Sequence, residues 1–235
     1  MSHPKIMNSK EMDKYYNTRR VKDMVDDLKE QHFLGDYISD KTGCKTVEII
    51  NACFHADKDH MFRPKNEDYI KREIEWYMSQ SLNVNDIEGE TPLIWKQVAS
   101  PNGFVNSNYG WMMFNEGNFD QYDNVKNEIL RDRTSRRAIA IYTRPNMHYT
   151  QNQQGMQDFS CTSTVQYLYR EGKLNAIVTM RSNDAVFGYP NDLAWQKFVL
   201  EKLCKDLRLE AGDIHWNVGS LHVYERHFQY LQEEK

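Results

Sequence analysis

Residues 161–184, CTSTVQYLYREGKLNAIVTMRSND, form the clearest hairpin pattern in this sequence of 235 residues. Two segments, 161–169 and 174–180, are rich in β-branched and aromatic residues, and the polar segment REGK joins them. This pattern predicts two antiparallel strands with a turn centred on Glu171-Gly172. The protein is therefore expected to contain a β-sheet that includes this hairpin.

The open end of the hairpin holds Cys161. With the turn placed as above, Cys161 lies opposite Ser182 and one step from Arg181, with Cβ atoms roughly 5 Å apart across the strands. A neighbouring guanidinium lowers the pKa of a thiol and favours the nucleophilic thiolate. The hairpin alone favours a plainer interpretation, a buried Cys and a surface Arg, and a β-bulge would change which residues face each other.

Outward from the hairpin, helical and strand patterns are interspersed without regular βαβ alternation. This mixture indicates the α+β class. Because we find no repeat, low-complexity tract or linker, we predict a single domain over residues 1–235 with a helical extension at 1–35. The predicted helices span 9–32, 66–79 (capped by Asn66), 121–130 and 192–207, the predicted strands span 46–54, 137–143 and 214–224, and irregular segments are expected at 83–110 and 145–159.

Composition limits the class of function. Apolar residues make up 40% and charged residues 27%, with a net charge of −4, which predicts an ordinary globular protein with no direct nucleic-acid binding. The four cysteines form no CxxC pair, so we predict no metal site. Neither a membrane span nor the apolar core of a signal peptide is found in the sequence. We therefore predict a cytoplasmic protein with reduced thiols.

Glu73 lies in an unexpected place on the helix predicted over residues 66–79. It falls on the face that carries Ile70, Ile74 and Tyr77, and a carboxylate that faces a core is costly unless it has a partner or a function. Burial would raise its pKa into the range useful for proton transfer. The alternative is a Glu at the edge of the apolar stripe whose side chain reaches water.

Three further groups have ordinary explanations when taken alone. Asp192 at a helix start complements the helix dipole. Arg136-Arg137 before a strand are either surface charge or a pair that binds phosphate through forked hydrogen bonds. His222 and Tyr224 share one strand face, as in ordinary sheet packing.

Taken together, these motifs resemble the thymidylate synthase family. The resemblance covers roughly residues 36–228, and its motifs are specific enough to replace the ordinary explanations with functional ones. From the nucleophile onward the spacing is kept without a gap through Cys161, Arg181-Ser182-Asn183-Asp184, Gly188-Tyr189-Pro190-Asn191-Asp192 and His222-Val223-Tyr224. Upstream, the matching motifs are Glu73-Ile74-Glu75-Trp76-Tyr77, Ser135-Arg136-Arg137 and the phosphate loop Asp40-Lys41-Thr42-Gly43.

Asp192 departs from the family pattern. Thymidylate synthases have Asn at this position, whereas Asp is what the deoxycytidylate hydroxymethylases of T-even-like bacteriophages have. Cytosine presents an N4 donor and a bare N3, and a protonated Asp matches both by donating to N3 and accepting from N4. The resemblance therefore implies cytosine as the base. Further departures are Thr162 beside the nucleophile, Val98 near the folate, and a short C-terminal segment after His227.

The resemblance implies a thymidylate-synthase-like fold, with a mixed sheet flanked by helices and a homodimer packed sheet to sheet. The implied reaction transfers one carbon from 5,10-methylenetetrahydrofolate to C5 of dCMP and hydrates it. The products would be tetrahydrofolate and 5-hydroxymethyl-dCMP for modified phage DNA. Other phage nucleotide-synthesis enzymes are further expected partners.

The resemblance also implies a role for each site residue. Cys161 is the nucleophile, Glu73 serves proton transfer and water activation, and Asp192 reads the base. The folate would face Trp95, Tyr109 and Asp184. The other implied substrate-binding residues are Lys41, Arg181, Ser182 and Asn183, with Arg136 and Arg137 reaching the phosphate across the dimer interface, and His222 and Tyr224 binding the sugar hydroxyl.

Two alternatives stay open at this point. One is a C5 methylase of dUMP or dCMP that keeps hydride transfer and releases dihydrofolate. The other is an inactive homologue that binds RNA or protein partners. The intact set of Cys161, Glu73 and Arg181 argues against inactivity, and the absence of a long basic stripe argues against RNA binding.

Overall fold

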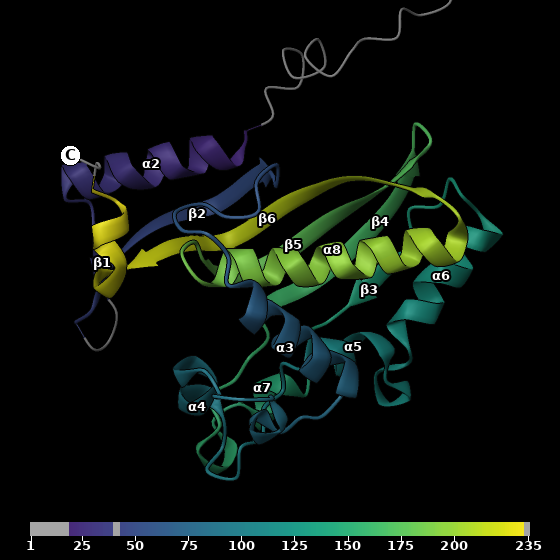
Figure 1. Cartoon of the computed structure of the whole chain (residues 1–235), viewed down its shortest axis with the longest axis horizontal. Coiled ribbons are helices and arrows are strands. Elements are labelled where there is room, and N and C mark those ends of the chain that lie inside the picture. Colours follow the sequence, from purple (N-terminus) through teal and green to yellow (C-terminus); the bar gives the residue numbers. More distant parts are fainter. Residues whose placement is uncertain (1–18, 40–42, 233–235) are drawn as a thin grey trace, which may run out of the picture.

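The computed structural model describes residues 19–39 and 43–232, which pack around a mixed β-sheet (Figure 1). The strands are β1 (Ile38–Ser39), β2 (Lys45–His55), β3 (Ile139–Ile141), β4 (Thr162–Arg170), β5 (Lys173–Asp184) and β6 (Glu210–Tyr224). The α-helices are α2 (Val21–Leu34), α3 (Glu67–Ser79), α4 (Leu93–Val98), α5 (Tyr109–Phe114), α6 (Gln121–Arg131), α7 (Met147–Thr150) and α8 (Gly188–Leu207). Short 3-10 segments lie at Val84–Asp86, Glu116–Asn118, Gln153–Gly155 and Glu225–Tyr230.

The strands of the described residues lie in the order β1-β2-β6-β5-β4-β3. β5 and β6 run parallel, and the other neighbouring pairs are antiparallel. A parallel pair needs a crossover of a dozen or more residues. Here α8, which follows β5 and precedes β6 in the chain, provides the crossover and runs along the sheet (Figure 1). A mixed sheet with flanking helices confirms the predicted α+β fold.

One face of the sheet is covered by helices. α8 contacts β5 and β6, and α2 contacts β2. Every second residue of β5 from Leu174 to Met180 is buried, and Trp216 of β6 packs edge-on against Tyr189 of α8. Each large apolar side chain buried in this way stabilises the fold by about 1.5–3 kcal/mol. This layer therefore forms the rigid support for the residues at the ends of β5 and α8.

The opposite face is more exposed and carries apolar side chains. Ile139 and Ile141 of β3 are 39% and 49% exposed. The strand register aligns Ile139 with Gln166 of β4 and, through it, with Ile177 of β5. We call the surface formed by Ile139, Ile141 and Ile177 the open sheet face. Exposed apolar side chains gathered on one surface are typical of an interaction site.

Most of the predicted elements are confirmed, with shifted ends. α3 matches the helix predicted over 66–79, and Asn66 caps it by accepting a hydrogen bond from the backbone N–H of Tyr69 at 3.1 Å. α8 begins at Gly188 rather than at residue 192, since Pro190 falls in the first turn, where no N–H donor is needed. Asp192 therefore lies in the second turn and does not open the helix.

Other differences concern short elements. The segments 83–110 and 145–159 were expected to be irregular, but they contain α4, the start of α5, and α7. Helices this short carry weak periodicity, because one or two turns present few residues to a core. Of the helix predicted over 9–32, residues 9–18 lie outside the described residues, and α2 accounts for the rest. Within the described residues, no helix is long and apolar enough to cross a membrane.

Candidate active site

A β-bulge places Cys161 opposite Arg181. The hairpin register follows the prediction as far as Thr164, but a shift before Thr162 moves the pairing by one residue. The backbone N–H of Arg181 donates to the carbonyl oxygen of Cys161 at 2.8 Å. The predicted pairing of Cys161 with Ser182 is therefore wrong, because the bulge adds one residue to β4.

The Arg181 side chain folds back over the segment that carries Cys161. Its Nε donates to the carbonyl oxygen of Ser160 at 3.0 Å, and its Nη2 donates to that of Phe159 at 2.7 Å. Nη2 also lies 3.7 Å from the Sγ of Cys161. The guanidinium is thus fixed beside the thiol, and because the residue is exposed it can also meet an anionic ligand.

Burial dominates the ionisation of Cys161. It raises the pKa of the thiol to about 12, with the guanidinium of Arg181 acting in the opposite direction and the carboxylates of Asp192 and Asp158 adding to the rise. Arg181 lowers the pKa of the thiol, as predicted, but desolvation raises this pKa by more. A thiol with this pKa is mostly protonated at neutral pH.

Asp192 on α8 has hydrogen-bond partners on β5 and α5. Asn183 donates its Nδ2–H to Oδ2 of Asp192 at 2.7 Å. Burial raises the pKa of Asp192 to about 8, and the neighbouring Glu73 carboxylate raises it further, while hydrogen bonds from Tyr109 and Asn183 oppose the rise. A carboxyl group with this pKa is mostly protonated at neutral pH, so it can donate a hydrogen bond as well as accept one.

Glu73 is buried on the inner face of α3, as its position in the apolar stripe predicted, and is 5% exposed. Tyr69, one turn earlier, donates its hydroxyl to Oε1, and the indole Nε1 of Trp95 donates to the same oxygen at 3.1 Å. Burial raises the pKa of Glu73, and these hydrogen bonds oppose the rise. The group is therefore held in one orientation and tuned toward proton transfer.

The structure gives two of the predicted folate-facing residues other contacts. Trp95 is half-buried, and its indole N–H is directed at Glu73 and at the hydroxyl of Tyr69. Tyr109 is only 3% exposed, and its hydroxyl accepts a hydrogen bond from the backbone N–H of Thr162 at 3.3 Å. Tyr109 thereby links the Cys161 segment to Asp192, and its contact with the folate stays a prediction.

The predicted sugar-binding residues lie at the end of β6. His222 is buried, and its Nδ1 lies 3.3 Å from the hydroxyl of Ser220, whereas its Nε2 has no hydrogen-bond partner among the described residues. Burial lowers the pKa of His222 and keeps the ring neutral. The ring of Tyr224 packs edge-on against it. Asp184, opposite His222 on β5, accepts the backbone N–H of Val186 at 2.8 Å.

Arg136 and Arg137 lie just before β3, away from the Cys161 cluster. They line an open pocket with a cavity volume of about 760 Å³, whose lining residues do not include Cys161 or Arg181. Lys41, the predicted phosphate ligand, lies outside the described residues. Within this chain the structure therefore brings together Cys161, Arg181, Asp192, Asn183 and Glu73, but not the Arg136-Arg137 pair.

Two supporting residues were not predicted. Tyr69 could have been found from the sequence, because it precedes Glu73 by one helical turn. Asp158 carries no such signal. Its carboxylate accepts the backbone N–H groups of Asn106 and Ser107 at 2.6 and 2.7 Å and so ties the loop before Tyr109 to the Cys161 segment.

Similarity to known proteins covers nearly all of this chain. The family described as Thymidylate synthase matches residues 22–234. The chain is 57% identical over 200 residues to the Deoxycytidylate 5-hydroxymethyltransferase of Enterobacteria phage T4, covering 82% of this chain and 81% of that protein. The proteins of the same name from phages T2 and T6 match to the same extent.

More distant relatives share the fold. A Thymidylate synthase of Francisella tularensis subsp. holarctica is 23% identical over 211 residues, covering 83% of this chain and 77% of that protein. Among solved structures, thermostable thymidylate synthase A from Bacillus subtilis superposes with a TM-score of 0.68 at 20% identity, covering 92% of this chain and 85% of that one. This structural likeness supports the fold alone.

Proposed function

Because the chain belongs to the thymidylate synthase family, we propose that it transfers a one-carbon unit to C5 of dCMP and hydrates it to 5-hydroxymethyl-dCMP. The one-carbon unit comes from 5,10-methylenetetrahydrofolate, which leaves as tetrahydrofolate. The setting we propose is the cytoplasm of a phage-infected bacterium, where the product would be used in phage DNA synthesis.

The feature that carries this proposal is the setting of Asp192, which accepts a hydrogen bond from Asn183 and whose pKa is raised by burial. With a pKa of about 8 it can donate to N3 of cytosine and accept from the N4 amino group. Uracil presents a donor at N3 and an acceptor at O4, so the same pair of contacts would leave buried polar groups unmatched. The environment of Asp192 therefore favours dCMP over dUMP.

Cys161 and Asp192 act on the ring together. Cys161 first loses its thiol proton to water. When its Sγ then bonds to C6, the electrons of the C5=C6 double bond move toward N3, and Asp192 supplies the proton that N3 takes up. C5 thereby becomes nucleophilic and bonds to the one-carbon unit. Arg181 lies 3.7 Å from Sγ and stabilises the thiolate as it forms.

Glu73 is the residue we assign to the later steps. Glu73 accepts the C5 proton and passes it to the departing tetrahydrofolate, which leaves the ring with an exocyclic methylene. Glu73 takes a proton from the water that adds to this carbon, and Cys161 leaves C6 to restore the aromatic ring. Tyr69 and Trp95 hold the Glu73 carboxylate during this transfer.

The remaining site residues bind the phosphate and sugar of the nucleotide and the folate. Arg181, Ser182 and Lys41 hold the phosphate in this proposal, and the free Nε2 of His222, with Tyr224, binds the sugar hydroxyl. Folate would lie near Trp95 and Asp184, where Leu93 and Ile94 of α4 are exposed apolar neighbours suited to a flat ring system.

A homodimer completes the proposal. The open sheet face is apolar and exposed, which suits packing against a second copy of the chain. A dimer would also bring Arg136 and Arg137, which lie apart from Cys161 in this chain, to the phosphate site of the second copy. We treat residues 1–235 as one domain and other nucleotide-synthesis enzymes as further partners.

One assay tests the reaction. The protein is incubated with dCMP or dUMP and 5,10-methylenetetrahydrofolate, and both products are identified by mass. We expect 5-hydroxymethyl-dCMP and tetrahydrofolate from dCMP. A methylated base with stoichiometric dihydrofolate, which has its own absorbance, would instead make the protein a methylase.

A further inference from the structure

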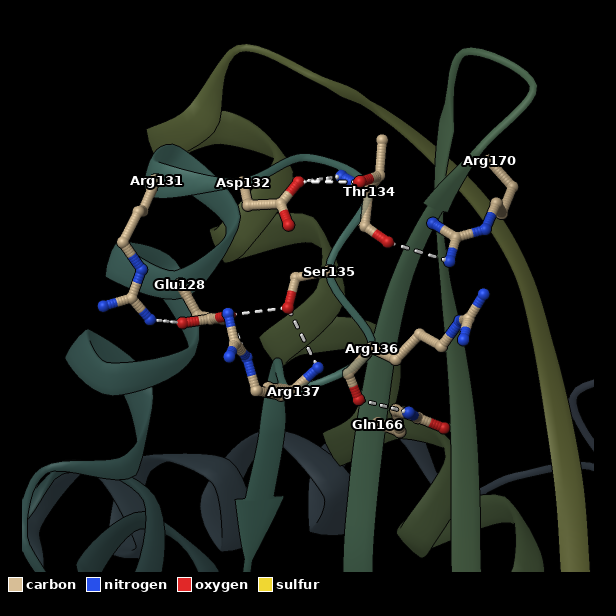
Figure 2. Close-up of polar contacts among 9 residues, drawn as sticks. All are labelled: Glu128, Arg131, Asp132, Thr134, Ser135, Arg136, Arg137, Gln166 and Arg170. Carbon is tan, nitrogen blue, oxygen red and sulfur yellow. Dashed lines mark hydrogen bonds and ion pairs between the residues drawn. The ribbon is translucent and has the colours of Figure 1, made fainter.

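Glu128 is a buried carboxylate on α6 that no part of the proposed reaction uses. The residue is 7% exposed, whereas the side chains of its two arginine partners are exposed. Its Oε1 accepts the hydroxyl of Ser135 at 2.5 Å and the Nε–H of Arg137 at 3.0 Å, and its Oε2 pairs with Arg131 (Figure 2). A buried charge needs partners of this kind, because leaving it unpaired is strongly destabilising.

These contacts close a ring around Arg137. The backbone N–H of Arg137 donates to the hydroxyl of Ser135 at 3.0 Å, and that hydroxyl donates in turn to Glu128. Glu128 also accepts the Nε–H of the Arg137 side chain. The backbone and the side chain of Arg137 are thus both fixed to the same carboxylate, which restricts the direction in which the guanidinium points.

The choice of Nε matters for recognition. An Arg binds phosphate through a fork of parallel N–H groups, and the terminal Nη atoms extend furthest from the chain. The contact with Glu128 uses Nε, and 75% of the Arg137 side chain stays exposed. The end of the guanidinium is therefore presented to the pocket at a fixed angle.

Arg136 is held differently. Its carbonyl oxygen accepts the Nε2–H of Gln166 at 2.7 Å, which fixes the backbone. Figure 2 shows its side chain on the side of β4 near Arg170, whereas the Arg137 side chain turns toward α6. The pocket also contains Arg133 and Arg170. Glu128 offsets part of the repulsion that these like charges exert on one another.

We propose that Glu128 is a positioning residue for phosphate recognition, which orients Arg137 toward the 5′-phosphate of the nucleotide bound by a second copy of the chain. This inference rests on the proposed function, since it assumes that Arg137 reaches that phosphate. Glu128 does not touch the substrate. It acts by fixing the guanidinium before the nucleotide arrives, so that less side-chain freedom is lost on binding.

The test separates nucleotide binding from chemistry. Glu128→Ala should raise the KM for dCMP about tenfold, because a misplaced binding group weakens recognition, while kcat stays close to the wild-type value. Ser135→Ala removes the hydroxyl link without leaving charges unpaired and should raise KM in the same direction. Arg131→Ala, which breaks the other ion pair of Glu128 outside the pocket, is the control and should leave KM unchanged.

A double-mutant cycle decides whether Glu128 acts through Arg137. In an Arg137→Ala background, Glu128→Ala should have no further effect on KM. Additive effects of the two substitutions would overturn the positioning role, as would a fall in kcat with KM unchanged. If Arg137→Ala alone leaves KM unchanged, the proposed phosphate role of Arg137 fails. If Arg137→Ala raises KM but Glu128→Ala and Ser135→Ala do not, only the inference on Glu128 fails.

Discussion

Asn183 donates a hydrogen bond to Oδ2 of Asp192 across 2.7 Å, and its own orientation is fixed by a third residue. The indole Nε1 of Trp216, which can only donate, points at the Oδ1 of Asn183 at 3.2 Å. Asn183 must therefore present its amino group to Asp192. Oδ2 of Asp192 is then an acceptor, which leaves Oδ1 as the oxygen from which a protonated Asp192 would donate to a nucleobase.

The substitution Asp192→Asn tests whether the carboxyl group of Asp192 makes the site prefer cytosine over uracil. We expect Asp192→Asn to lower kcat/KM for dCMP by about 100-fold or more and to give a measurable gain for dUMP, since a site built for one hydrogen-bonding edge rejects the other strongly. The measurement is the ratio of kcat/KM for the two nucleotides. Asp206→Asn, an exposed acid on the same helix, is the matched control. An unchanged ratio in Asp192→Asn would remove the main support for dCMP.

The raised pKa of Asp192 predicts how stability depends on pH. Its folded-state pKa is about 8, whereas an unfolded Asp titrates near ~3.9. Between these values the unfolded chain holds fewer protons at this residue, so the free energy of unfolding falls as the pH rises. This loss should be complete once the pH has passed the folded-state pKa.

Denaturant unfolding of wild type and Asp192→Asn at several pH values measures this effect. The stability of the wild type relative to the variant should decrease from about pH 4 to about pH 8. Both proteins share their other titrating groups, so the difference between the two curves isolates Asp192. A difference that stays constant over this range would mean that Asp192 is ionised in the folded protein.

The contrast between Cys161 and Glu73 shows what the sequence could predict. The position of Glu73 follows from helical periodicity, which depends only on neighbours within a few residues, and the structure confirms that it is buried. The partner of Cys161 depends on a bulge before Thr162. The bulge reflects how β4 fits between its neighbouring strands, so alternation within the hairpin could not predict it.

Glu128 and Asp158 are two buried residues whose roles could not be predicted from the sequence. Both are buried carboxylates whose partners lie on other segments, Ser135 and Arg137 for Glu128, and Asn106 for Asp158. In the sequence they look like any surface acid, because nothing local distinguishes a residue that will be covered by tertiary packing. The Arg136-Arg137 motif was recognisable, but the carboxylate that orients it was not.

Removal of the Tyr69 hydroxyl should change the pH dependence of turnover. The hydrogen bond from Tyr69 lowers the pKa of Glu73, against the larger effect of burial. Tyr69→Phe should therefore raise that pKa and shift the acid limb of the kcat profile upward by about one pH unit. Activity at neutral pH would fall and partly recover at higher pH. Tyr37→Phe, which loses a hydroxyl remote from Glu73, should keep the wild-type profile. A uniform loss without a shift would mean that Tyr69 has only a packing role.

Shared active sites should be detectable by mixing Cys161→Ser chains, which are inactive, with Arg137→Ala chains at a dCMP concentration far below their raised KM, where they have little activity of their own. In the proposed dimer, each site combines Cys161 of one chain with Arg137 of the other. When Cys161→Ser and Arg137→Ala chains exchange subunits, one of the two sites in each hybrid has both groups intact. Random exchange of an equal mixture should therefore restore about a quarter of the wild-type activity.

Mixing Cys161→Ser with Asp192→Asn is the control, because these two residues belong to the same site of one chain. Every hybrid site then lacks one of them, and no activity should return. If subunit exchange is demonstrated but the first mixture stays as inactive as the control, Arg137 acts within its own chain or not at all, and the cross-interface phosphate site is wrong.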